Sequence, residues 1–358
     1  MSLNSNLLPG PVNIPLQVRT CMLNPPFSHR VLAFKRLYKE IVTFVKSIGM
    51  PEVQILQGNG TLANDVVANQ LLGIYGKGLI LENGEFGKRL LRQAQVVGLD
   101  YMTFSSKPGA PVAMDKLQQA LLENDIKWVW FVHCETSTGQ VNPIQEIVKR
   151  CNELNIICAV DAISTLGNFP VHFYGVSFVS STSGKGLSSF PGLSLVMYRK
   201  VLNENAVSHF LDLAYHVKQN NVPFTLSSNQ LQALNEGFKF SFTQEHFNHI
   251  ANLSQIITTW EFNHFKRMEV DAHNPAVHTF IVAKNIDALF IGDQLEAKGV
   301  IVNCRTQYLN EVNAFQICLM GDISGLDLKS LLEVLNEIDE KCKFIGLTKN
   351  IQVLEYKS

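Results

Sequence analysis

The segment SSTSGKGLSSFPGLSLV (residues 180–196) places a lone lysine, Lys185, between two glycines and between two β-rich runs. Residues 176–179 form the run before it and residues 193–196 the run after it. We therefore expect Lys185 at a strand end, where hydroxyls and small residues leave its amine room to meet a ligand. A partly desolvated lysine is nucleophilic and forms a Schiff base with an aldehyde such as that of pyridoxal 5'-phosphate (PLP). The other interpretation is a solvated lysine in a turn. Residues upstream of Lys185 favour the Schiff-base lysine.

Length and charge narrow the class of protein. The chain has 358 residues, enough for two domains, because single cores stop growing at about 250 to 300 residues. Its net charge of −1, with 17% charged residues, predicts no binding of nucleic acid or of an anionic membrane. The N-terminus has no signal-peptide pattern, and no apolar run approaches the roughly 18 residues of a membrane span. We expect a cytoplasmic protein.

The cysteines indicate neither a disulfide framework nor a metal site. Their number is odd, and no CxxC pair or Cys/His metal spacing is present in the sequence. We expect them to be buried small apolar residues in a reducing compartment. They are Cys21, Cys134, Cys151, Cys158, Cys304, Cys318 and Cys342.

The N-terminal part predicts an arm followed by a helix. Residues 4–20 are rich in Pro, Gly and Asn, so we expect an extended arm over residues 1–20 that lies on another surface. Residues 31–48 carry apolar side chains near a 3.6-residue period, which predicts an amphipathic helix.

Strand and helix patterns then alternate, which predicts a mostly parallel sheet covered by helices on both faces. Ligands of such sheets bind beyond the carboxyl ends of the strands. The expected strands are residues 53–56, 79–81, 96–102, 127–132, 156–160, 177–180 and 193–198; the expected helices include residues 61–72, 86–94, 114–122 and 144–154.

Three strand ends carry chemistry. In QGNGTLAND (residues 57–65), Gly60 and Thr61 begin a helix whose free N–H groups can hold a phosphate, although a capped helix start is as good an interpretation. HCETSTG (residues 133–139) offers hydroxyls to a polar ring substituent, or is a Ser/Thr-rich turn. Asp161, in VDAIST, ends an apolar run, and a buried carboxylate needs a cation. The pyridinium nitrogen of PLP is such a cation, while helix capping is the alternative.

Beyond Lys185 we expect a turn and helix over residues 221–238, then a long helix from residue 244 to about 265 that connects to a small domain. The predicted division is an arm (1–20), a large domain (21–248) and a small C-terminal α+β domain (249–358). In the last of these we expect strands at residues 279–283, 300–304 and 314–319 and helices at residues 286–297 and 328–342.

The order GNGT, ENGEFGKR, HCETSTG, VDAIST, TSGKG with FPG resembles the class V aminotransferases of PLP fold type I. The resemblance is greatest to the branches that act as 2-aminoethylphosphonate:pyruvate and alanine:glyoxylate aminotransferases. It covers nearly the whole chain and includes LLPGP (residues 7–11) and a PFT turn (residues 223–225). It implies an α/β fold with a mostly parallel seven-stranded sheet in the large domain.

The resemblance also implies roles for individual residues. Lys185 is the Schiff-base lysine and Asp161 the pyridinium partner. It also implies that Gly60 and Thr61 cradle the phosphate, that Phe86 stacks on the ring and that the Thr136 hydroxyl lies near the ring oxygen. Thr225 is implied to reach the cofactor of the other subunit, in a homodimer with shared active sites.

Two departures affect the expected contacts. The family has Gln or Asn before the lysine where this chain has Gly184, so Ser183 is a candidate substitute at the phosphate. The family motif F-R-I-G reads FQIC (residues 315–318) here, so Gln316 replaces the arginine that binds the substrate carboxylate. The nearest cation in sequence is Arg305, which is equally well interpreted as a surface arginine.

The sequence thus predicts a PLP-dependent aminotransferase that moves an amino group from a small donor, an amino acid or a 2-aminoethylphosphonate-like compound, to a 2-oxo acid such as pyruvate or glyoxylate. The alternatives are a lyase, racemase or desulfurase on the same scaffold, and a PLP-binding homologue without turnover.

Overall fold

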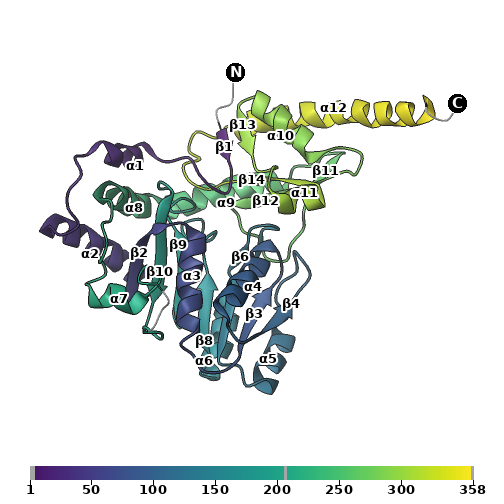
Figure 1. Ribbon diagram of the computed structural model, residues 1–358. Coiled ribbons are helices and arrows are strands. Elements are labelled where there is room, and N and C mark those ends of the chain that lie inside the picture. The colour runs from purple at the N-terminus through teal and green to yellow at the C-terminus, as the bar shows by residue number, and fades with distance from the viewer. Residues whose placement is uncertain (1–4, 205–207, 356–358) are drawn as a thin grey trace.

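The computed structural model describes residues 5–204 and 208–355, and the side chains among these up to residue 343. A large lobe is built around a twisted sheet and a smaller lobe lies against one end of it (Figure 1). The arm begins in the smaller lobe, at β1 (Ser5–Leu7), and the C-terminal helix α12 (Leu328–Glu355) projects from that same lobe. Residues 1–4 of the predicted arm and residues 356–358 of the predicted small domain lie outside the described residues.

The large sheet has seven strands, in the order β2-β10-β9-β8-β5-β3-β4. β9, β8, β5, β3 and β4 run parallel to one another, and β10 is antiparallel to both of its neighbours, β2 and β9. The predicted mostly parallel seven-stranded sheet is therefore confirmed. The strands are β2 (Glu52–Gly58), β3 (Gly78–Glu82), β4 (Tyr101–Ser105), β5 (Trp128–Val132), β8 (Ile157–Asp161), β9 (Phe178–Thr182) and β10 (Gly192–Tyr198). A short antiparallel pair, β6 (Cys134–Glu135) with β7 (Gln140–Val141), follows β5.

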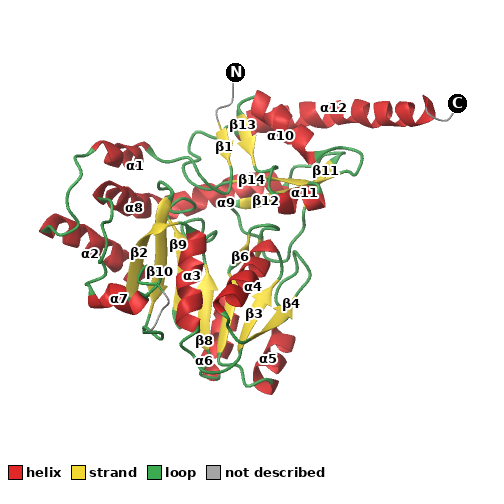
Figure 2. Ribbon diagram, viewed as in Figure 1, coloured by secondary structure: helices red, strands yellow, loops and turns green. Residues whose placement is uncertain are grey.

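Helices cover both faces of this sheet, as Figure 2 shows with the strands between them. Apolar residues of β5 alternate between the two faces: Val129 and Phe131 pack in one core, Trp128 and Trp130 in the other. The first core is closed by α2 (Leu32–Ser47), α5 (Met114–Glu123), α6 (Ile144–Glu153) and α8 (Ser228–Ser241). The second is closed by α3 (Gly60–Leu71), α4 (Glu85–Val97) and α7 (Leu213–Lys218).

The small lobe has its own core around the antiparallel sheet β11-β12-β14 and the parallel pair β1-β13. Its predicted α+β character is confirmed by these elements. They are α9 (Gln244–Thr258), β11 (Phe265–Arg267), β12 (Val277–Val282), α10 (Ala288–Ala297), β13 (Val300–Val302), α11 (Gln307–Val312), β14 (Ala314–Cys318) and α12. The division at residues 248 and 249 remains a prediction, and α9 runs across it.

Three local predictions are wrong. Residues 96–102 are not a strand: α4 continues to Val97, Gly98 ends it in a left-handed conformation (φ 82°), and the strand is β4 instead. The helix expected to run to residue 265 ends at Thr258, because Phe262 and Phe265 are buried in the small-lobe core. The arm is not wholly extended, since it contains β1 and the short helix α1 (Leu16–Thr20) before the 3-10 turn η1 (Cys21–Leu23).

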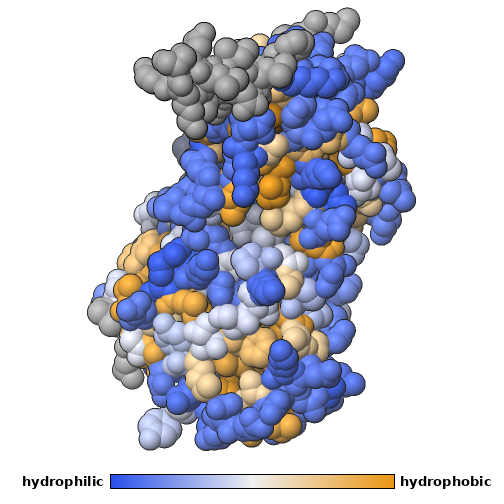
Figure 3. Space-filling model, turned by 90° about the vertical axis from the view of Figure 1, so that its right-hand side faces the viewer, coloured by the Kyte–Doolittle hydropathy of each residue, from blue (hydrophilic) through white to orange (hydrophobic). Residues whose placement is uncertain are grey.

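Within the described part of the chain, none of the helices is long and apolar enough to cross a membrane. Figure 3 shows hydrophilic residues over much of one face, with an apolar patch on the large lobe. All seven cysteines are free and buried, as predicted.

Candidate active site

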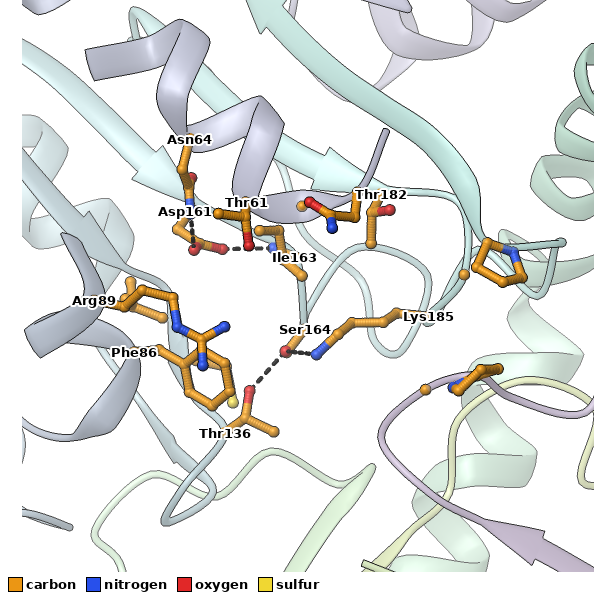
Figure 4. A pocket seen from close by; sticks show the side chains of 18 residues that line it. Thr61, Asn64, Phe86, Arg89, Thr136, Asp161, Ile163, Ser164, Thr182 and Lys185 are labelled. Carbon is orange, nitrogen blue, oxygen red and sulfur yellow. Dashed lines mark hydrogen bonds between the residues drawn. The ribbon is translucent and has the colours of Figure 1, made fainter. Parts of the chain in front are cut away.

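Lys185 lies in the turn between β9 and β10 and lines a cavity of about 290 Å³ at the carboxyl ends of the parallel strands. The cavity is seen from close by in Figure 4, where Lys185 extends toward Ser164. The Nζ atom donates a hydrogen bond to Ser164 Oγ at 3.1 Å. Burial lowers the pKa of the Lys185 amine, while nearby Asp161 opposes this. A lysine of lowered pKa has a larger neutral, nucleophilic fraction.

Asp161 is the last residue of β8 and faces the same cavity (Figure 4). Asn64 Nδ2 donates to its Oδ2 at 2.8 Å, and the Ile163 N–H donates to its Oδ1 at 2.9 Å. Asn64 is itself held by the Ser180 hydroxyl. Burial raises the pKa of Asp161, and these hydrogen bonds, with the charges of Lys185 and Arg89, act in the opposite direction. The carboxylate is thus oriented and partly compensated, so a cation placed against it would favour the ionised form.

The start of α3 lies at the cavity wall. Asn59 caps the helix by accepting from Leu62 N at 3.2 Å, and its carbonyl accepts from Ala63 N. The N–H groups of Gly60 and Thr61 donate to no other described residue. A side chain at residue 60 would collide with Ile163, since a Cβ there would lie 2.5 Å from Ile163 Cδ1. Glycine at residue 60 therefore lets this helix start lie close to the cavity, where the Gly60 and Thr61 N–H groups remain available as donors.

Phe86 enters from the first turn of α4, and the Arg89 guanidinium lies over its ring (Figure 4). Arg89 Cζ is 4.7 Å and Lys185 Nζ is 5.6 Å from the centre of its ring. The buried Glu135 carboxylate fixes this helix start, because it accepts from the Phe86 and Gly87 N–H groups at 3.0 Å. Phe86 and Ile163 both line the cavity, so a flat ring has apolar contacts available there.

Thr136 completes a chain of hydroxyls. Its Oγ1 donates to Ser164 Oγ at 2.6 Å, and Ser164 Oγ also accepts from Lys185 Nζ. Both hydroxyls are buried.

Comparison with known proteins identifies the family. The family model "Aminotransferase class-V" matches residues 43–302, more than half of the chain. The chain belongs to the class-V aminotransferases.

Curated relatives and solved structures agree with this membership. A 2-aminoethylphosphonate–pyruvate transaminase of Pseudomonas fluorescens (strain Pf0-1) is 26% identical over 360 residues, covering 93% of this chain and 95% of the relative. A bifunctional phosphonoacetaldehyde hydrolase/aminoethylphosphonate transaminase of Clostridioides difficile (strain 630) is 24% identical over 92% of this chain, which spans 56% of that relative. The crystal structure of an alanine–glyoxylate aminotransferase from Nostoc sp. has a TM-score of 0.82 at 23% identity, covering 95% of this chain and 96% of that one. The predictions of PLP fold type I and of a PLP-dependent aminotransferase are confirmed.

The structure brings six predicted site residues of this class-V aminotransferase together in one cavity. Its fit to PLP rests on the open donors of α3, the oriented carboxylate and the lysine amine. The six are Gly60, Thr61, Phe86, Thr136, Asp161 and Lys185.

Ser183 and Thr225 lie elsewhere. The Ser183 hydroxyl donates to the Phe190 carbonyl at 2.6 Å and accepts from Leu193 N at 3.1 Å. Ser183 does not line the cavity, so the structure does not place it at the expected phosphate contact. Thr182 lines the cavity in its place. Thr225 is exposed, away from this chain's own cavity, so its contact with a partner's cofactor remains a prediction.

The two predicted substrate residues are also displaced from the cavity lining. Arg305 is an exposed side chain paired with Asp293 at 2.6 Å and Glu296 at 2.7 Å, which contradicts its candidate role. Gln316 is wholly buried on β14. Its Nε2 donates to Thr136 O at 2.6 Å and to Thr279 Oγ1 at 2.9 Å, so it binds protein, not substrate.

Several lining residues were missed by sequence reasoning, among them Asn64, Arg89 and two residues of the arm. Asn64 and Arg89 each follow a recognised motif residue by three positions, which places them on the same helix face as Gly60 or Thr61 and Phe86. That spacing was the available signal. The arm contributes Gly10 and Pro11; a Cβ at residue 10 would be 2.9 Å from Gly184 O.

Proposed function

We propose that this chain transfers an amino group from a small amino donor, an amino acid or a 2-aminoethylphosphonate-like compound, to a 2-oxo acid such as pyruvate or glyoxylate. The observation that carries the proposal is the meeting of Lys185, Asp161 and the open N-terminus of α3 around one cavity. An amine nucleophile, a counter-ion for a pyridinium and a phosphate site are the three requirements of PLP.

Bound PLP supplies an electron sink for the carbon atom that bears the amino group. Each residue then has a part that follows from its contacts. Lys185 would hold the cofactor aldehyde and could move a proton at its Nζ, and Asp161 would keep the ring nitrogen protonated. The α3 N-terminus holds the phosphate through the N–H groups of Gly60 and Thr61. Phe86 would support the ring, and the Thr136 hydroxyl would lie near the ring oxygen.

Small acidic substrates are favoured by the names of the relatives, which include transaminases of 2-aminoethylphosphonate with pyruvate. The cavity volume of about 290 Å³ is consistent with a cofactor and a small substrate.

We also propose a homodimer in a cytoplasmic setting. The exposed Thr225 and its exposed neighbour Phe224 support a partner surface beside the PFT turn. Seven free cysteines support a reducing compartment.

Absorbance spectroscopy tests the proposal. The purified protein with PLP should show a visible cofactor band that is converted to the amine form by alanine, aspartate, serine or 2-aminoethylphosphonate, and that returns when pyruvate is added. A band that none of these donors changes would overturn transamination and favour a lyase or a binding protein. Sedimentation that finds an active, PLP-loaded monomer would overturn the homodimer.

A further inference from the structure

The acidic group of the substrate needs a cation, and the two positions expected to supply it do not. Gln316 is neutral, and its side chain is fully used: besides its two donated bonds, its Oε1 accepts from Asn303 Nδ2 at 2.9 Å and from the Tyr308 hydroxyl at 3.1 Å. Arg305 is neutralised by two carboxylates at the surface. The carboxylate or phosphonate of a substrate must therefore be recognised by another residue.

Arg89 is the remaining cation of the cavity. Among the described residues that line it, only Lys185 and Arg89 carry positive charge, and Lys185 is reserved for the cofactor aldehyde. Arg89 is half-buried, yet its guanidinium forms no hydrogen bond or ion pair with any described residue; its contact is the face of Phe86. A half-buried guanidinium with five unused donors is a ready partner for an anion.

The place of Arg89 suits a substrate group. It rises from the second turn of α4, one turn beyond Phe86, and its guanidinium lies over the ring near which the Lys185 amine also lies (Figure 4). The phosphate already has its own site at the α3 N-terminus, so Arg89 is not required for it. The other arginine of this helix surface, Arg92, is more exposed and pairs with Glu85 at 2.6 Å.

Resting on the proposed function, we propose that Arg89 is the specificity-determining residue that binds the anionic group of donor and acceptor, in place of an arginine at residue 316. The substrates are thereby those with a carboxylate, phosphonate or phosphate at short distance from the reacting carbon. A planar guanidinium binds such groups with two parallel charge-assisted hydrogen bonds.

The test compares two probes on the PLP-loaded protein. Aminooxyacetate and methoxyamine carry the same aminooxy group, which condenses with aldehydes, and only aminooxyacetate carries a carboxylate. Their half-saturating concentrations, followed by the cofactor absorbance, are measured for the wild type, Arg89→Gln, Arg89→Lys and the matched control Arg92→Gln. PLP affinity and the thermal midpoint are measured for each variant.

Arg89→Gln should raise the half-saturating concentration of aminooxyacetate at least tenfold and leave that of methoxyamine within twofold. Arg89→Lys should fall between Arg89→Gln and the wild type, and Arg92→Gln should match the wild type. Equal losses for both probes, an unchanged response to aminooxyacetate, or a loss of PLP affinity in Arg89→Gln would overturn the inference. A wild type that binds no PLP would overturn the proposed function itself, a distinct outcome.

Discussion

The large-lobe wall of the cavity carries three charged side chains, Lys185, Asp161 and Arg89, whereas the small-lobe strand β14 sends the neutral Gln316 to the Thr136 carbonyl. The described lining residues all come from the arm and the large lobe. Gln316 instead links the lobes, because it joins Thr279 of β12 to the Thr136 carbonyl. The contrast separates two surroundings: the charged side chains line the cavity, while Gln316 is held by hydrogen bonds within the protein.

The largest expected effect is on the charged wall. Lys185→Ala removes the only side-chain amine among the described residues that line the cavity, so amino transfer should fall at least about 1000-fold. The free energy of unfolding should change by less than about 1 kcal/mol, since the side chain makes one hydrogen bond, to Ser164. Turnover assays and urea unfolding check this, with Lys239→Ala, a paired surface lysine, as the control. Retained turnover in Lys185→Ala would contradict the assignment.

A second change removes the counter-ion from the same wall. Asp161→Asn leaves an oxygen to accept from Asn64 but removes the charge, and the rate of amino transfer should drop more than tenfold, about 1.4 kcal/mol of barrier. Single-turnover kinetics with a saturating donor measure the step. A smaller loss would indicate that Asp161 serves only to hold the start of the following loop.

The buried His133, between the lining residues Val132 and Cys134, gives a pH signature. Burial lowers the pKa of this histidine to about 4, whereas the unfolded chain titrates near 6.5. Between these values the unfolded state binds more protons, so the free energy of unfolding should fall as the pH is lowered through this window, by up to about 3 kcal/mol. The difference between the urea midpoints at pH 7 and pH 5 should be smaller in His133→Gln than in the wild type, and unchanged in the exposed control His172→Gln. Part of the difference should remain in His133→Gln, because burial also lowers the pKa of His246, His273 and His278. Equal pH dependence in His133→Gln and the wild type would show that His133 is not the source.

Substitutions of Gln316 and Arg305, which lie outside the cavity lining, should have the smallest effects on catalysis. Gln316→Ala leaves the buried Thr136 carbonyl without its donor, so we expect a loss of about 1 to 3 kcal/mol in unfolding free energy with PLP binding retained. Gln307→Ala, an exposed glutamine of α11, should change stability by less than about 0.5 kcal/mol, as should Arg305→Gln. A rise of tenfold or more in the half-saturating concentration of a 2-oxo acid in Arg305→Gln would restore Arg305 to the substrate site.

Much of the sheet was predictable because its strands are continuous apolar runs that end in polar residues, as at Asp161. The edge strand β4 was not, because its pattern is half-exposed and the valines before it belong to the end of α4. The helix predicted to reach residue 265 failed because periodicity alone does not distinguish a helix from an aromatic segment buried by tertiary packing.

The site residues, like the strands, were predictable where a sequence motif marks a strand end. Residues in motifs at strand ends, such as Lys185 and Asp161, were found, since a parallel sheet brings these ends together. Arg89 had a signal in its spacing from Phe86, whereas Ser164 and Gly10 depend on which way a side chain or a distant arm points, which the sequence does not state. Ser183 was chosen for its place beside the lysine, yet the turn directs its hydroxyl back to Phe190.

The account depends most on the covalent role of one lysine. Borohydride reduction of the PLP-loaded protein, followed by proteolysis and mass spectrometry, fixes the pyridoxyl group at the residue that held it. We predict a single modified peptide with the label on Lys185. A label on any other lysine, or an unlabelled protein, would contradict the account.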